Sequence, residues 1–272
     1  MTATEPRVGV AVGAAPVPAV SLRNITRVYG DRIAVDGMTL DVAPGELFGF
    51  LGPNGAGKTT TIRMLTGLLR PSAGSAAICG HDVVTDAPRA RALVGYCPDN
   101  PALYDKLTGR EMLGLAADLY GVPREIQAAR IDPLLTTFGL ERHGDELVQS
   151  YSRGMRQKLS LGCALLHDPE VLFLDEPTVG LDPAGARQLK DVLRGLCADG
   201  RTVFLSTHVL EVAELLCDRV GVVQGGRLVT VGSPAELRAV GGHDSLEEAF
   251  LRITGGEDPG GDVRPLLRAL DS

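Results

Sequence analysis

The stretch Gly52-Pro53-Asn54-Gly55-Ala56-Gly57-Lys58-Thr59 sets the interpretation of the whole chain. It matches the pattern G-x-x-x-x-G-K-S/T, and it lies between a short apolar run, residues 46–51, and an amphipathic pattern that is typical of a helix. Glycines at these positions let backbone N–H groups turn inward around phosphate groups, and a helix that starts here adds the positive end of its dipole. The sequence therefore predicts a phosphate-binding loop between a strand and a helix.

The side chains of this loop have distinct expected roles. We expect Lys58 to reach the β- and γ-phosphates of a nucleotide and the hydroxyl of Thr59 to bind Mg²⁺. The helix that follows is expected to end at Pro71. Its predicted apolar face consists of Ile62, Leu65, Leu68 and Leu69. The predicted nucleotide-binding set consists of Gly52, Pro53, Asn54, Gly55, Ala56, Gly57, Lys58, Thr59 and Thr60.

A second apolar run, residues 171–174, is followed directly by the carboxylates Asp175 and Glu176. A carboxylate at the end of a buried strand beside a phosphate loop can hold Mg²⁺, directly or through water, and we expect this of Asp175. Glu176 would then lie beside the γ-phosphate, where it can orient or deprotonate an attacking water. The alternative is a solvated acidic turn, and the phosphate loop in the same chain favours the functional interpretation.

Composition narrows the classes of function. The 272 residues include 27 Lys and Arg against 34 Asp and Glu, a net charge of −7 with no clustered basic run, which argues against nucleic-acid binding. The five cysteines are odd in number and unlike zinc or redox motifs in spacing, which favours a reducing compartment. No stretch approaches the roughly 20 apolar residues of a membrane span. Residues 1–20 are predicted to form a disordered tail.

The expected elements alternate strands and helices, which is typical of an α/β fold. Residues 21–28 and 33–42 predict an antiparallel hairpin, and residues 107–166 predict an inserted helical region. Between these lies a second small β region with one short helix, residues 75–98. The remaining expected elements are strands at 171–174, 201–206, 219–223 and 227–231, helices at 184–198, 209–216 and 245–253, and a mobile tail after Gly255.

The segment Tyr151-Ser152-Arg153-Gly154-Met155-Arg156-Gln157 precedes the second apolar run and opens a helical pattern. It resembles the signature motif of ABC-type ATPases, which usually reads Leu-Ser-Gly-Gly-Gln. Ser152 and Gly154 match this motif, whereas Tyr151, Arg153 and Met155 depart from it. With the motifs below, the resemblance covers roughly residues 21–255.

Other features follow in the order found in this family. Tyr29 lies where an aromatic ring stacks on adenine, and Asp182 belongs to a segment that resembles the D-loop. His208 ends a predicted strand and resembles the switch histidine that senses the γ-phosphate. Asp99 stands where the family's Q-loop has glutamine, and its carboxylate is expected to meet Mg²⁺ or a water bound to it. The histidines that match no motif are His81, His143, His167 and His243.

The resemblance implies an ATP- and Mg²⁺-dependent ATPase with a P-loop core, an N-terminal antiparallel β subdomain and an inserted α-helical subdomain. It implies an ATPase domain over 21–240 with the helical subdomain at about 100–166, and a C-terminal helix and tail over 241–272. Two such subunits close head to tail around ATP, so we expect a homodimer, and a heterodimer with a related subunit is the alternative. A separate membrane-spanning permease is the expected partner, at the cytoplasmic face of the cell membrane.

Two segments bear on what the ATPase drives. Residues 245–255 resemble the C-terminal element of ABC-2-type exporter ATPases, although an ordinary amphipathic docking helix fits equally. Residues 99–120 border the surface that the family uses toward its permease. There Tyr104, Leu107 and Leu113 line either that contact or, the favoured interpretation, the core of the helical subdomain. The alternatives to an exporter subunit are a soluble ABC-type machine, a module that holds ATP without hydrolysis, and an importer subunit.

Overall fold

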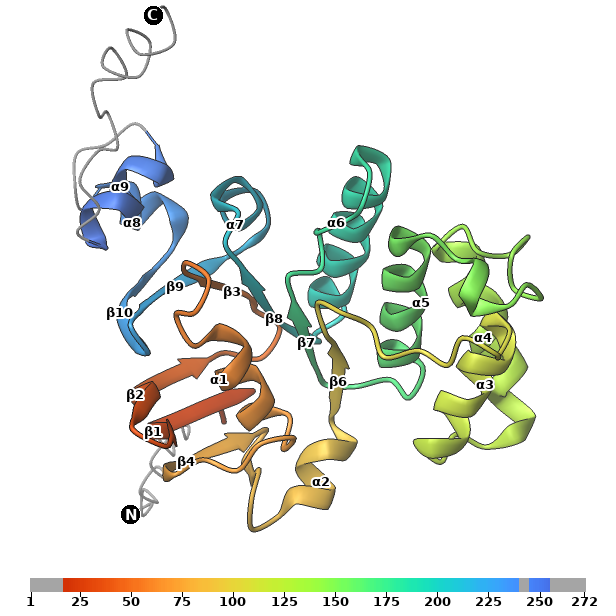
Figure 1. The fold of residues 1–272 in the computed structure, drawn as a ribbon, viewed down its shortest axis with the longest axis horizontal. Coiled ribbons are helices and arrows are strands. Elements are labelled where there is room, and N and C mark those ends of the chain that lie inside the picture. The colour runs from red at the N-terminus through yellow and green to blue at the C-terminus, as the bar shows by residue number, and fades with distance from the viewer. Residues whose placement is uncertain (1–16, 240–244, 255–272) are drawn as a thin grey trace, which may run out of the picture.

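A computed structural model describes residues 17–239 and 245–254 (Figure 1). The central sheet has six strands in the order β10-β9-β3-β8-β7-β6. All adjacent pairs are parallel except β9 with β10, which is antiparallel. These strands are β3 (Leu47–Leu51), β6 (Val94–Cys97), β7 (Val171–Asp175), β8 (Thr202–Thr207), β9 (Arg219–Gln224) and β10 (Arg227–Gly232).

The inner strands of this sheet are buried on both faces. Every residue of β3, β7 and β8 is buried, which explains their nearly continuous apolar runs. Alternation along each strand divides these side chains between two hydrophobic cores, one on each face of the sheet. In β3, Phe48 points to one core while Leu47 and Leu51 belong to the other.

Aromatic rings lie at the centre of the first core, which is between the central sheet and the N-terminal β subdomain. Phe204 has its ring centroid 5.4 Å from that of Phe48, 5.1 Å from that of Phe50 and 5.4 Å from that of Phe173. Helix α1 (Lys58–Leu65) adds Ile62, among other residues, to the same cluster. The phosphate loop is therefore attached to a strand and a helix that are both anchored in this core.

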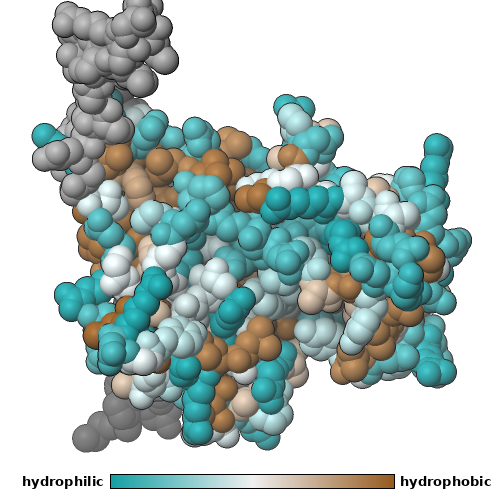
Figure 2. Space-filling view, in the orientation of Figure 1, coloured by the Kyte–Doolittle hydropathy of each residue, from teal (hydrophilic) through white to brown (hydrophobic). Residues whose placement is uncertain are grey.

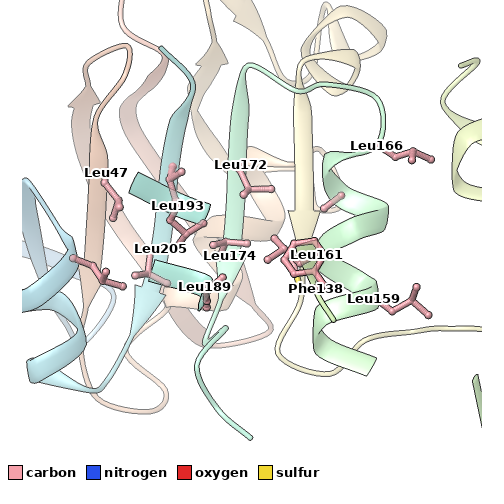
Figure 3. Close-up of a cluster of buried hydrophobic side chains, with 14 of the residues drawn as sticks. Leu47, Phe138, Leu159, Leu161, Leu166, Leu172, Leu174, Leu189, Leu193 and Leu205 are labelled. Atoms are coloured by element: carbon pink, nitrogen blue, oxygen red, sulfur yellow. The ribbon is translucent and has the colours of Figure 1, made fainter. Parts of the chain in front are cut away.

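Leucines dominate the second core, on the opposite face of the sheet. Figure 3 shows Leu189 and Leu193 of α6 (Pro183–Ala198) lying beside Leu205 of β8. Helix α7 (Leu210–Leu216) and helix α5 (Arg153–Leu165) pack into the same cluster. Because α5 also belongs to the helical subdomain, this core joins that subdomain to the sheet.

The N-terminal subdomain is a four-stranded antiparallel sheet in the order β2-β1-β4-β5. Its strands are β1 (Val20–Tyr29), β2 (Arg32–Val42), β4 (Ala73–Ile78) and β5 (His81–Asp82). The predicted hairpin is confirmed, with a turn at Gly30 in the left-handed region (φ 55°). The N–H of Ala19 donates to the carbonyl of Val42, so the sheet starts inside the stretch predicted as a tail. The rest of that tail, residues 1–16, lies outside the described residues.

The helical subdomain leaves the sheet after β6 and returns through α5. It contains α3 (Gly109–Leu119), α4 (Arg124–Thr137) and a 3₁₀ turn at Val148–Ser150. Thr108 and Glu111 form a reciprocal capping box at the start of α3. Leu113 is buried and Leu107 packs against the core, as favoured from the sequence, whereas Tyr104 is exposed.

Two sequence-based expectations about local structure are wrong, and one helix was missed. The helix after the phosphate loop ends at Leu65, because Gly67 adopts a left-handed conformation (φ 70°), and Leu68 is 64% exposed rather than part of an apolar face. Residues 94–97 pair with β7 in the central sheet instead of extending the small β region. Helix α8 (Pro234–Ala239) was not expected, although Ser233 and Glu236 form a capping box there.

The C-terminal helix α9 (Leu246–Ile253) packs on the body of the protein. Its residues Leu246 and Ala249 are buried, and it contacts α7 and α8. The amphipathic docking that was one of two interpretations of this segment is therefore observed. His243 and the tail after Gly255 lie outside the described residues. Across residues 17–239 and 245–254, no helix has both the length and the apolar character needed to cross a membrane.

Replacing Phe204 tests the aromatic core. Phe204→Ala should lower the free energy of unfolding by about 3–5 kcal/mol, because it leaves a cavity among three packed rings. Leu68→Ala is the matched control and should change it by less than about 0.5 kcal/mol, because Leu68 is exposed. Urea denaturation followed by circular dichroism measures the free energy of unfolding of both variants. A large loss for Leu68→Ala would mean that the apolar face predicted from the sequence exists after all.

Candidate functional site

The phosphate loop runs from β3 to α1. At two of its glycines a side chain would collide with backbone atoms of other segments. A Cβ at Gly52 would lie 2.4 Å from the carbonyl oxygen of Val223, and a Cβ at Gly57 would lie 2.5 Å from that of Ala34. Gly57 also has φ 102° and caps α1 without a side-chain hydrogen bond. The first N–H groups of α1 therefore face the loop with no acidic residue in the first turn, which suits an anion.

Lys58 is nearly buried, and the loop itself holds it. Its Nζ donates to the carbonyl oxygen of Gly52 at 2.6 Å and to that of Pro53 at 3.3 Å. The same Nζ lies 3.3 Å from Oε1 of Glu176. A cation fixed in this way is directed at the place that the loop encloses, where phosphate oxygens can take over its donors.

Asp175 ends β7 and is only 2% exposed. The hydroxyl of Thr59 donates to its Oδ2 at 2.7 Å, and the hydroxyl of Ser206 donates to its Oδ1. A buried carboxylate needs such partners, because burying an unpaired charge is costly. These contacts connect the helix after the loop with the ends of two neighbouring strands.

Glu176 follows Asp175 and has an unusual backbone for a non-glycine residue, with φ 50°. This conformation is strained, and it turns a side chain that is only 12% exposed toward the phosphate loop. Its Oε2 lies 2.9 Å from Nδ1 of His208 and accepts from the N–H of His208 at 3.3 Å. Its Oε1 faces Nζ of Lys58 at 3.3 Å and accepts no hydrogen bond from the residues that the structure describes, so this oxygen can accept a proton or orient a water once Lys58 moves away.

An open cleft of about 410 Å³ lies over the phosphate loop. Tyr29 lines this cleft, and the guanidinium of Arg27 lies over one face of its ring, 4.6 Å from the ring centroid. The lining residues are Tyr29, Arg32, Ala34, Pro53, Asn54, Gly55, Gly57, Lys58, Thr59, Thr60, Asp99 and Glu176. The structure thus brings most of the predicted nucleotide-binding residues around one space, including Tyr29 and Asp99.

Seven predicted residues do not line this cleft. Four of them adjoin its lining within the loop or at the strand ends: Gly52, Ala56, Asp175 and His208. The other three lie at the starts of α5 and α6. Ser152 caps α5 by accepting from the N–H of Met155 at 3.3 Å, and Asp182 caps α6 by accepting from the N–H of Gly185 at 2.9 Å. A Cβ at Gly154 would lie 3.2 Å from the carbonyl oxygen of Gly180, so the start of α5 packs on the loop that leads to α6. The three residues form a second set at the N-terminal ends of two helices.

Two neutral groups border the carboxylates. Burial raises the pKa of the Cys97 thiol to about 12, and the negative charge of Asp175 adds to this effect. Burial and the same carboxylate raise the pKa of the Tyr96 hydroxyl to about 12. Both side chains are therefore uncharged at neutral pH and leave the charge of the site to Lys58 and the carboxylates.

The sequence reasoning missed two contributors. Ser206 was assigned no role from the sequence, and its hydrogen bond to Asp175 requires β7 and β8 to be neighbours, which the strand order alone reveals. Arg32 lines the cleft directly opposite Tyr29 in the register of β1 and β2. The predicted hairpin could have indicated this pairing, because residues that flank a two-residue turn face each other.

The oxygen groups near the loop suit a magnesium ion. Asp175 supplies a carboxylate, and Thr59 and Ser206 supply hydroxyls, which are hard ligands of the kind that Mg²⁺ accepts. Within the described ranges no cluster of three or more His, Cys, Asp and Glu forms an all-protein metal cage. Mg²⁺ usually keeps waters and substrate phosphates as ligands, so one carboxylate with hydroxyls fits this ion.

Comparisons with known proteins agree with this geometry. Residues 35–179 match the family described as ABC transporter. The chain is 44% identical over 237 residues to the daunorubicin resistance ATP-binding protein DrrA3 of Streptomyces coeruleorubidus, covering 87% of this chain and 75% of that protein. It is 42% identical over 222 residues to a Nod factor export ATP-binding protein I of Burkholderia lata, covering 82% and 73%. A solved ATP-binding subunit of an ABC transporter superposes with a TM-score of 0.81 at 33% identity, covering 86% of this chain and 99% of that one.

The fold and the site define a P-loop ATPase in which a phosphate loop, two strand-end carboxylates and a strand-end histidine meet at one edge of the central sheet. The chain belongs to the ABC transporter family, and it is an ATP-binding and ATP-hydrolysing cassette of the type found in transporters.

Replacing Gly57 tests the geometry of the loop. Gly57→Ala should weaken Mg·ATP binding by at least about tenfold, since a side chain at φ 102° is strained by about 1–3 kcal/mol and its Cβ would meet Ala34. Gly195→Ala is the control, because no atom lies within 4 Å of its Cβ position in α6. It should keep the affinity and raise stability by about 0.5–1 kcal/mol. Wild-type affinity in Gly57→Ala, measured by titration calorimetry, would contradict the close approach.

Proposed function

We propose that this cassette is the ATPase subunit of an exporter, and that it moves a separate membrane-spanning permease through ATP-dependent dimerisation. The observation that supports the catalytic part most is the arrangement of Lys58 and Glu176. Nζ of Lys58 lies 3.3 Å from Oε1 of Glu176, and within the described residues this oxygen accepts no hydrogen bond. A phosphate-binding cation and a candidate base therefore share the same space.

The residues of the cleft divide the binding of Mg·ATP between them. Lys58 would transfer its donors from the loop carbonyls to the β- and γ-phosphates, and Thr59 and Asp175 would hold the metal. When bound, Mg²⁺ would supply positive charge that offsets the charge of the phosphate oxygens. Tyr29 would stack on adenine with its free face, since Arg27 covers the other. Asp99 lines the same cleft and would meet the metal or its water.

Hydrolysis would depend on Glu176 and His208. Glu176 is fixed by the backbone N–H and the ring of His208, so its second oxygen can accept a proton from a water in line with the γ-phosphate. His208 would position both this carboxylate and the γ-phosphate. Because Lys58 also pairs with Glu176, arrival of the nucleotide would withdraw Lys58 and leave Glu176 free to act as a base.

The second set of residues suggests why two subunits are needed. Ser152, Gly154 and Asp182 do not line the cleft of their own chain, within the residues that the structure describes. The start of α5 nevertheless presents N–H groups of a kind that bind phosphate. A second copy placed head to tail would bring these groups to the open side of the nucleotide, so we infer a homodimer with two ATP molecules between its subunits.

The permease contact would lie on the helical subdomain. Tyr104 is exposed in the segment that follows Asp99, and Leu119 and Tyr120 are exposed at the end of α3. Figure 2 shows apolar residues reaching the surface at the end of the molecule formed by α3 and α4. The names of the two sequence relatives, one for daunorubicin resistance and one for Nod factor export, support export. Such a subunit would sit on the cytoplasmic face of the membrane through its permease.

Glu176→Gln tests the catalytic assignment. It should keep Mg·ATP binding and slow turnover by about 10²-fold or more, because the amide cannot accept a proton. Glu170→Gln is the matched control at an exposed position immediately before the same strand, and it should leave turnover unchanged. Phosphate release measures turnover. Wild-type turnover in Glu176→Gln would rule out the general base.

Affinity purification tests the transporter assignment. The tagged chain, taken from host membranes in mild detergent, should bring down one multi-spanning membrane protein in stoichiometric amount. Leu119→Ser should reduce this recovery, whereas Leu215→Ser, a change of the same kind at an exposed leucine of α7, should not. Recovery of ribosomes or nucleic acid instead, with the chain entirely in the soluble fraction, would favour a soluble ABC-type machine.

A further inference from the structure

Two ion pairs join the first turn of α5 to the segment that leaves the sheet after β6. A guanidinium nitrogen of Arg156 lies 2.7 Å from Oδ1 of Asp105, and a guanidinium nitrogen of Arg153 lies 3.5 Å from Oδ1 of Asp99. The two arginines thus start the helix that returns from the helical subdomain, while the two aspartates lie on the segment that leads into it. These pairs bridge the two places where the chain passes between the core and the helical subdomain.

Cations at this end of a helix need an outside partner. The first turn of α5 contains Arg153 and Arg156 and no acidic residue, so the helix dipole disfavours both charges. Asp99 and Asp105 supply the missing negative charge from another segment. Withdrawal of either carboxylate would leave an arginine with a strong tendency to find another anion.

The two pairs differ in strength. Arg156 is 26% exposed, and it donates both to Asp105 and to the carbonyl of Val148, which makes a fixed structural contact. Arg153 and Asp99 are 63% and 52% exposed, and their separation is too long for a hydrogen bond. Exposed pairs of this kind stabilise a fold little, so this contact can open easily.

Asp99 and Arg153 each touch a second part of the ATPase site. Asp99 lines the nucleotide cleft together with Lys58. The stem of Arg153 lies against the loop that follows Glu176, because a Cβ at Gly180 would be 2.9 Å from Cδ of Arg153. The pair therefore links the cleft, the loop after the catalytic carboxylate and the start of α5.

We propose that Asp99 and Arg153 form a nucleotide-sensitive latch between the ATP cleft and the helical subdomain. Arg153 holds the Asp99 carboxylate while the cleft contains no nucleotide. Mg·ATP competes for this carboxylate and breaks the pair, which frees Arg153 and the start of α5. This inference rests on the proposed function, because it names how the cleft would report nucleotide to the helical subdomain.

A double-mutant cycle on the full chain tests the latch. Binding of Mg²⁺ with the non-hydrolysable analogue AMP-PNP is measured by titration calorimetry for wild type, Arg153→Met, Asp99→Asn and the double variant. Arg153→Met keeps the stem that covers Gly180 and removes the competitor for Asp99, so it should tighten binding about two- to fivefold. In the Asp99→Asn background the same change should have no effect, and Arg153→Lys should bind as wild type does.

Weaker or unchanged binding by Arg153→Met, or equal tightening in both backgrounds, would overturn the latch. Asp105→Asn is the control for structure, since it removes the fixed pair. It should lower the thermal midpoint without changing affinity, whereas Arg153→Met should leave the midpoint near that of wild type. Absence of binding by the wild-type chain would contradict the proposed function itself. Binding without coupling between Asp99 and Arg153 contradicts only the latch.

Discussion

The hydrogen bonds of Asp175 to Thr59 and Ser206 hold the site together, because they join the first turn of α1 to the ends of β7 and β8. Asp175 is buried, so its negative charge has little water to stabilise it. Two hydroxyls compensate in part, and a magnesium ion with phosphate ligands would do so more fully. The carboxylate thus fixes the protein groups and leaves a local excess of negative charge that attracts a cation.

Strand order makes this convergence possible. β8 lies between β3 and β7 in the central sheet, and all three are parallel. Their carboxyl ends therefore meet at one edge, where α/β proteins bind ligands. Lys58, Glu176 and His208 each follow a different strand of the three, and they meet although more than 100 residues separate the first from the other two. The two hydrophobic cores on the faces of the sheet keep these strand ends in register.

Much of this arrangement follows from local sequence. The phosphate loop, the hairpin before it and the buried strand before Asp175 have patterns that depend on neighbouring residues alone, and the structure contains each of these elements. Expectations failed where a distant partner or a single backbone conformation decides. Leu68 continued an apolar period, but the left-handed Gly67 ends the helix first. Residues 94–97 resembled the preceding β region, but their partner is β7, more than 70 residues away.

The contacts of charged groups were the least accessible from the sequence. Asp99 and Arg153 each depart from the family pattern, and the sequence gives no reason to consider the two departures together. In the structure a guanidinium nitrogen of Arg153 lies 3.5 Å from Oδ1 of Asp99, so the two departures together create an ion pair. The glutamine and glycine that the family usually has at these positions could not form it. Lys58 and Glu176 show the same principle, since a cation and a base that bind one substrate attract each other before it arrives. In both cases opposite charges are paired near the cleft and can be separated by a nucleotide, so the charges that bind the substrate also set the resting state of the site.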